Sequence, residues 1–102
     1  MLPAKIQELV VNLRERTEKG LMTWNYDDDA STVTIVQDNF KLSITYKFDD
    51  IEEVGRFNIK YTDTNKFKDY FFSTTQQYSD YEIVRSLFDS AQSSELDIDL
   101  DD

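Results

Sequence analysis

The stretch Phe40–Phe48, which reads FKLSITYKF, contains the clearest structural signal in the chain. Large apolar or aromatic residues occupy its even positions, and lysine, serine or threonine occupies its odd positions. Because successive side chains of a β-strand point to opposite faces, this alternation predicts a strand with one buried face and one face in solvent. The stretch therefore predicts a sheet that is covered on one side only.

Four neighbouring segments are also rich in β-prone residues. Short links between them favour an antiparallel meander, and Asp38-Asn39 before the central stretch suits a hairpin turn because both residues tolerate positive φ. An acidic turn over Asp49–Glu53 separates the central stretch from the next strand. Besides 40–48, the predicted strands cover residues 21–26, 32–37, 56–62 and the less regular 69–73.

Helical periodicity flanks this set of strands at both ends. Pro3–Lys19 is predicted as a helix that ends at Gly20, a residue that readily adopts the left-handed conformation. A second helix is predicted to begin at Ser79, whose side chain and that of Glu82 have the spacing of a capping box. The apolar positions that define the two helices are Ile6, Leu9, Val10 and Leu13 in the first, and Ile83, Val84, Leu87, Phe88 and Ala91 in the second.

These elements predict an α+β fold with two layers. One layer is an antiparallel sheet of four or five strands, and the other holds the N- and C-terminal helices, both packed on the face that carries Trp24, Ile44 and Ile59. We expect a single domain over residues 1–94, followed by an acidic C-terminal tail, residues 95–102.

Composition excludes several functional classes. The chain has 102 residues, a net charge of −10, and neither cysteine nor histidine, which removes the commonest nucleophiles, general bases and transition-metal ligands. An acidic protein is also a poor binder of nucleic acid, because phosphate contacts need cations. We therefore expect no enzymatic activity, no cofactor, no direct nucleic-acid binding and no membrane association, and we expect a cytoplasmic protein.

Carboxylate clusters at Asp27-Asp28-Asp29 and Asp49–Glu53 could in principle bind a hard cation such as calcium. Both clusters lie where turns are predicted, and both lack the glycine and the terminal bidentate glutamate of a calcium loop. The acids are therefore interpreted as turn residues, and no metal site is predicted.

Cations follow a different pattern from the acids. Strand parity places Lys41, Lys47, Arg56 and Lys60 on the uncovered face, among serine, threonine and asparagine, while the acids gather in the turns. This cationic patch could bind an acidic partner, a small anion or the acidic tail, although lysine and threonine are also ordinary residues of an exposed strand face. In the tail, Asp97, Asp99 and Asp101 alternate with Leu96, Ile98 and Leu100, a composition typical of an interaction segment.

Two segments carry a resemblance. Thr17-Glu18-Lys19-Gly20 followed by Trp24, in the pattern T-x-x-G-x-x-x-W, and the later run Leu87–Ala91 leading into Leu96-Asp97-Ile98 resemble small bacterial and prophage proteins. The resemblance covers about a third of the chain. It implies a bacterial or phage protein and no particular activity.

Two functions remain open at this point. The first is a binding protein without catalysis, a regulator, inhibitor or immunity-type partner that acts by protein–protein interaction and uses its acidic surface or tail to occupy a basic site, including one that normally holds nucleic acid. The second is a module that binds a small ligand or anion, or a weak enzyme, using the open sheet face or an aromatic pocket near Trp24, Tyr46, Tyr61 and Tyr70. Aromatic side chains that fill the core would count against the second function.

Overall fold

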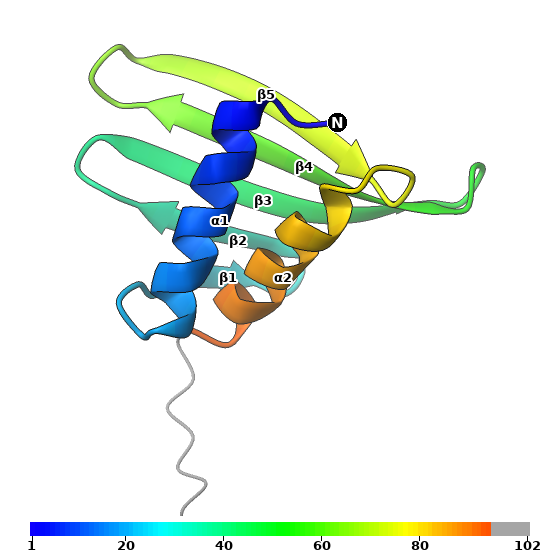
Figure 1. Ribbon diagram of the computed structural model, residues 1–102, viewed down its shortest axis with the longest axis horizontal. Coiled ribbons are helices and arrows are strands. Elements are labelled where there is room, and N and C mark those ends of the chain that lie inside the picture. The colour runs from blue at the N-terminus through cyan, green and yellow to red at the C-terminus, as the bar shows by residue number, and fades with distance from the viewer. Residues whose placement is uncertain (95–102) are drawn as a thin grey trace, which may run out of the picture.

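The computed structural model describes residues 1–94 and shows an α+β protein with the predicted order of elements. Five antiparallel strands form one open sheet in the order β1-β2-β3-β4-β5, between an N-terminal and a C-terminal helix (Figure 1). The elements are α1 (Ala4–Glu18), β1 (Asn25–Asp27), β2 (Thr32–Val36), β3 (Phe40–Asp49), β4 (Val54–Asp63), β5 (Lys68–Thr75) and α2 (Tyr81–Gln92).

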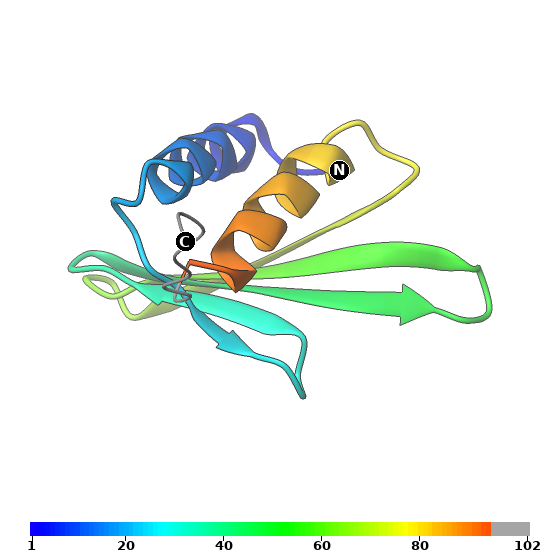
Figure 2. The same ribbon diagram turned by 90° about the horizontal axis from the view of Figure 1, so that it is seen from below.

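Both helices pack on the same face of the sheet, which leaves the other face uncovered (Figure 2). The core between the layers contains buried apolar side chains from α1, β2, β3, β4 and α2, and the loops before α1 and β1 add Leu2, Met22 and Trp24 to it. Tyr26 of β1 and Phe72 of β5 pack against this core and are partly buried. Trp24, Ile44, Ile59, Leu13, Leu87 and Phe88 are buried in this single core, as the sequence predicts, and Leu9 packs against it half-buried.

The central hairpin is longer than the sequence predicts. β3 and β4 pair over ten residues each, from Phe40 opposite Asp63 to Asp49 opposite Val54, and the end of this hairpin reaches past the helices (Figure 2). Phe48, which has the parity of the buried residues, is therefore more than half exposed. Strand parity assigns its direction correctly, but no helix covers it.

Thr17, Gly20 and Trp24 of the short motif form one structural unit. Gly20 adopts a φ of +76° just after α1, so the chain turns back toward the sheet. The Trp24 indole N–H then donates to the Thr17 hydroxyl over 2.9 Å, and that hydroxyl donates to the carbonyl of Leu13 over 2.7 Å. A buried indole needs such an acceptor, so the motif fixes the loop before β1 to the last turn of α1.

Two local predictions about strands and turns are wrong. The first strand begins only at Asn25, because the Trp24 N–H donates to the side chain of Ser94 rather than to a neighbouring strand. The turn before β3 does not use positive φ at Asp38 or Asn39; the non-glycine residues with positive φ are Ser31, Glu53 and Phe67, in the other three turns between strands.

The predicted capping box at Ser79 is also wrong. α2 begins at Tyr81, its N-cap residue is Asp80, and no side chain caps its first turn. The buried Asp80 carboxylate accepts hydrogen bonds from the Leu2 N–H and the Thr74 hydroxyl instead. It thereby ties the start of the chain and the end of β5 to the beginning of α2, a connection between distant segments that no local motif reports.

Candidate functional site: the open sheet face

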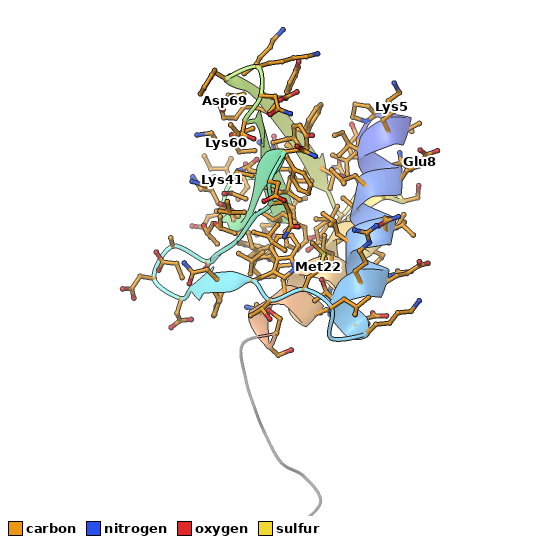
Figure 3. The ribbon with its side chains drawn as sticks, turned by 90° about the vertical axis from the view of Figure 1, so that its left-hand side faces the viewer. Lys5, Glu8, Met22, Lys41, Lys60 and Asp69 are labelled. Carbon is orange, nitrogen blue, oxygen red and sulfur yellow. The ribbon has the colours of Figure 1, made fainter. Side chains whose placement is uncertain are left out.

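The uncovered side of the sheet, called the open face below, is formed by alternate residues of all five strands. Lys41 and Lys60 point away from α1, whereas Lys5 and Glu8 lie on the outer side of that helix (Figure 3). The residues with this direction are Asn25, Asp27, Thr32, Thr34, Val36, Lys41, Ser43, Thr45, Lys47, Asp49, Val54, Arg56, Asn58, Lys60, Thr62, Asp69, Phe71, Ser73 and Thr75.

The four predicted cations all lie on this face, but the register spreads them along the central hairpin. Lys47 is directly opposite Arg56, whereas Lys60 is opposite Ser43 and Lys41 is opposite Thr62. They therefore form a row over β3 and β4 rather than one tight cluster. Of these four cations, only Lys60 has an acidic partner within residues 1–94, namely Asp69 at 3.9 Å.

Acids also share the open face, outside the segments 40–48 and 56–62 on which the sequence predicts none. Asp69 lies on β5, Asp27 on the other edge strand and Asp49 at the end of β3. Each accepts a local hydrogen bond: Asp69 from the Thr62 hydroxyl, and Asp27 and Asp49 from backbone N–H groups of the turns that follow them. The acids occupy the margins of the face and the cations its centre.

Two cross-strand pairs of hydroxyl groups link β2 and β3. Thr32 and Thr45 are hydrogen-bonded at 2.8 Å, and Thr34 and Ser43 at 3.2 Å. These cross-strand pairs hold the side chains of the open face in a defined arrangement without any covering layer. Thr32 also donates to the Ala30 carbonyl over 3.0 Å, so Thr45 is the donor in the first pair, whereas the Thr34–Ser43 pair keeps one hydroxyl hydrogen for a carboxylate placed beside the lysines.

A shallow hollow of about 550 Å³ lies over β3, β4 and β5. Ser43, Thr45, Lys47, Asn58, Lys60 and Ser73 line it, and Phe71 stands at its side with 72% of its surface exposed. The Lys60 ammonium lies 5.8 Å from the centre of the Phe71 ring, within the range of a cation–π interaction. An exposed aromatic beside cations is a combination that favours recognition of another molecule.

Phe71 and Asp69 belong to β5, and the sequence did not predict that they lie on the open face. The signal was present, because Asp69, Phe71 and Ser73 alternate with Tyr70, Phe72 and Thr74. The run is short, however, and two adjacent phenylalanines hide which one points inward. Only the pairing of Phe72 with the buried Ile59 settles the parity.

At one end of the face, two buried polar atoms have no hydrogen-bond partner among the described residues. They are Nε of Arg56 and the hydroxyl of Thr75, which are direct cross-strand neighbours. Buried donors of this kind are normally paired.

The predicted aromatic pocket does not form around the residues that were expected to line it. Trp24 is completely buried, and Tyr61 packs between Phe40 and Tyr70. Tyr46 instead joins Tyr81 in an open cleft of about 410 Å³ on the helical side. Its other lining residues are Phe57, Arg85, Phe88, Asp89 and Gln92.

Gly55 allows the two tyrosine hydroxyls of this cleft to come together. A Cβ atom at Gly55 would lie 2.8 Å from the Tyr81 hydroxyl and 2.9 Å from that of Tyr46, so a larger residue would displace both rings. Burial raises the pKa of Tyr81 above its ordinary value, and the nearby Tyr46 raises it further. The Tyr81 hydroxyl is therefore a neutral hydrogen-bonding group at physiological pH.

Asp27 and Asp49, which belong to the two acidic clusters, accept hydrogen bonds from backbone N–H groups of the turns. Within residues 1–94, no three acidic side chains form a group that could hold a metal ion. Of the described helices, neither is long and apolar enough to cross a membrane. The predicted partner-binding residues Asp97, Asp99 and Asp101 lie outside the described residues.

The resemblance of the short motif to bacterial and prophage proteins stays a prediction. In comparisons with known proteins, no protein-family model, curated protein or solved structure matches this chain.

Proposed function

We propose that this protein is a non-enzymatic binding protein that recognises an acidic, extended segment of a protein partner through its open face. One observation carries the proposal: an acidic protein keeps one face of its sheet uncovered and places Lys41, Lys47, Arg56 and Lys60 along the centre of that face. A strongly acidic chain has no need of such a cationic row for solubility.

The chemistry of the face supports an acidic ligand. The cations supply charge, the threonine and serine hydroxyls supply donors, and Phe71 supplies an apolar anchor beside the hollow. Charged groups steer a partner, and an exposed aromatic side chain beside them adds apolar contact area to the binding energy. An extended peptide with alternating acidic and apolar side chains meets all three requirements.

The test uses a synthetic peptide in which glutamate alternates with valine, with a lysine–valine peptide as control. We expect the glutamate peptide to shift the backbone amide resonances of Thr45, Asn58 and Phe71 in the ¹⁵N-labelled protein, and the lysine peptide to leave them unchanged. Raising the salt concentration should weaken the binding, because the attraction is largely electrostatic.

A charge reversal on the open face should remove this binding. Lys47→Glu with Lys60→Glu should lower the affinity for the glutamate peptide on the order of tenfold or more, because two attractive charges become repulsive. The matched control is Lys5→Glu on α1 with Lys19→Glu at the C-cap of that helix, which changes the net charge equally without touching the open face. Equal losses in the two double variants would show that only the net charge matters and would contradict the proposal.

A second function is favoured by the cleft at Tyr46 and Tyr81. Two adjacent hydroxyls, Arg85 and several aromatic rings suit a small planar ligand that carries a hydrogen-bond acceptor. A panel of aromatic carboxylates tested by NMR would reveal it through shifts at Gly55 and Arg85. Tyr81→Phe should weaken such binding, and a panel in which no compound shifts these residues would remove this second candidate.

A further inference from the structure

We infer that the acidic segment, residues 95–102, binds the open face of its own molecule and competes there with the partner. This inference rests on the proposed function of that face. It adds a regulatory step, because the partner must displace residues 95–102 from the open face before it can bind.

The acidic segment has the composition that the open face favours. Its sequence, ELDIDLDD, alternates acids with Leu96, Ile98 and Leu100. In an extended conformation, the carboxylates at 95, 97, 99 and 101 would all point to one side, because side chains alternate along an extended chain. The carboxylates near the end of the segment would then face cations of β3, while the apolar residues resemble the anchors expected of a partner.

The acidic segment also starts in a suitable place. The last described residue, Ser94, accepts the Trp24 N–H through its hydroxyl at 2.7 Å, directly before Asn25 of β1. β1 is an edge strand, and α2 ends beside it (Figure 1). A chain that continues from Ser94 can therefore pass round the β1 edge to the open face without crossing another strand.

The length of the acidic segment is sufficient for this path. Eight extended residues span about 26 to 29 Å. Passing from the helical layer to the other side of the sheet takes about 10 Å, and reaching β3 or β4 takes two or three strand spacings of about 4.8 Å each. The end of the segment can therefore reach Lys41 or Lys47 on β3, and at full extension it reaches β4.

On this path, the acidic segment first passes the two hydroxyl pairs between β2 and β3. Thr32 and Thr34 on β2 lie between the β1 edge and the lysines of β3, and each is paired with a hydroxyl residue of β3. The Thr34–Ser43 pair keeps one hydroxyl hydrogen that can turn toward a carboxylate. A carboxylate that approaches from β1 thus meets a hydrogen-bond donor before it meets the cations.

Binding within one molecule needs only weak intrinsic affinity. A short connection gives an effective concentration in the millimolar range, so a contact of millimolar strength would be substantially formed. Such an internal ligand reduces the apparent affinity for a partner by roughly three- to tenfold if the effective concentration exceeds its dissociation constant by a similar factor.

The experiment neutralises the acidic segment in the full-length chain. The variant Asp97→Asn, Asp99→Asn, Asp101→Asn keeps length and shape and removes three charges. The control Glu8→Gln, Glu15→Gln, Glu18→Gln removes three charges from exposed positions of α1, across the sheet from the open face. Both are compared with the unchanged protein by amide chemical shifts and by affinity for the glutamate–valine peptide.

We expect the Asp97/Asp99/Asp101 variant to shift the amides of Ser43, Thr45 and Lys60 and to bind the peptide about three- to tenfold more tightly than the α1 control. Equal affinities in the two variants, or shifts restricted to the neighbourhood of Ser94, would overturn the inference. Differences that disappear on dilution would show that a second copy supplies the acidic segment, which also contradicts binding within one molecule.

The two proposals fail in different ways. If all variants bind the peptide on the open face with equal affinity, the proposed function stands and the competition by residues 95–102 is refuted. If the peptide leaves the open face unchanged in every variant, including the neutralised one, both proposals are refuted.

Discussion

The two faces of the sheet are built from the same strands, yet different constraints act on them. On the covered face, Ile44 and Ile59 lie opposite each other and are almost completely buried under the helices. One residue further along, Thr45 and Asn58 also lie opposite each other, and they face solvent with only their neighbours on the sheet to contact. Packing fixes the identity of the first pair, whereas the second pair is free to serve recognition.

The two faces should respond differently to substitution. A residue on the covered face that changes size disturbs two layers at once. A residue on the open face changes only the chemistry presented to another molecule. Substitutions on the two faces should therefore separate stability from binding.

The largest effect is expected on the covered face. Leu87→Ala removes a completely buried side chain of α2 and leaves a cavity between the layers, so unfolding should become easier by about 2 to 5 kcal/mol. Chemical denaturation followed by tryptophan fluorescence would measure this loss, because Trp24 lies in the same core. A loss below about 0.5 kcal/mol would mean that the helical layer does not depend on this contact.

An intermediate effect is expected at the polar link inside the core. Thr17→Val keeps the shape of the side chain but leaves the buried Trp24 indole N–H without its acceptor, which should cost about 1 to 3 kcal/mol of stability. Thr17→Ser retains the hydroxyl and is the control. If the serine variant is destabilised as much as the valine variant, the methyl group of Thr17 matters as much as its hydroxyl, and the hydrogen bond contributes little.

The smallest effect on stability is expected on the open face. Lys47→Glu with Lys60→Glu should change the free energy of unfolding by no more than about 0.5 kcal/mol, because both side chains are exposed and the Lys60–Asp69 pair is a surface contact. Thermal and chemical denaturation would measure it. A double variant that unfolds would show that the face contributes to folding, and the separation of the two faces would fail.

Much of the fold could be predicted because local patterns and burial agree. The alternation in 40–48 and the apolar stripes of the two helices each allow one direction for the buried side chains, and a one-residue slip would place lysines in the core. Boundaries were less predictable. The residues before Asn25 alternate like a strand but satisfy their backbone through Ser94, seventy residues away.

The open face shows the same division. The directions of Lys41, Lys47, Arg56 and Lys60 follow from parity within each strand. Their spacing does not, because it depends on which residues pair across the β3–β4 hairpin, and the ten-residue pairing places only Lys47 and Arg56 directly opposite each other. The direction of Phe71 depends on the pairing of β5 with β4, which the sequence of the short fifth segment could not specify alone.

The sequence by itself determined the class of fold, the inward and outward sides of its main strands, and the absence of cysteine and histidine chemistry, because these depend on composition and on periods of two and 3.6 residues. Only the tertiary structure decided which cations have acidic neighbours, how far the central hairpin reaches past the helices, and that Asp80 binds the start of the chain rather than capping α2. These features depend on contacts between segments that are distant in sequence, and a local pattern carries no information about which distant groups will meet.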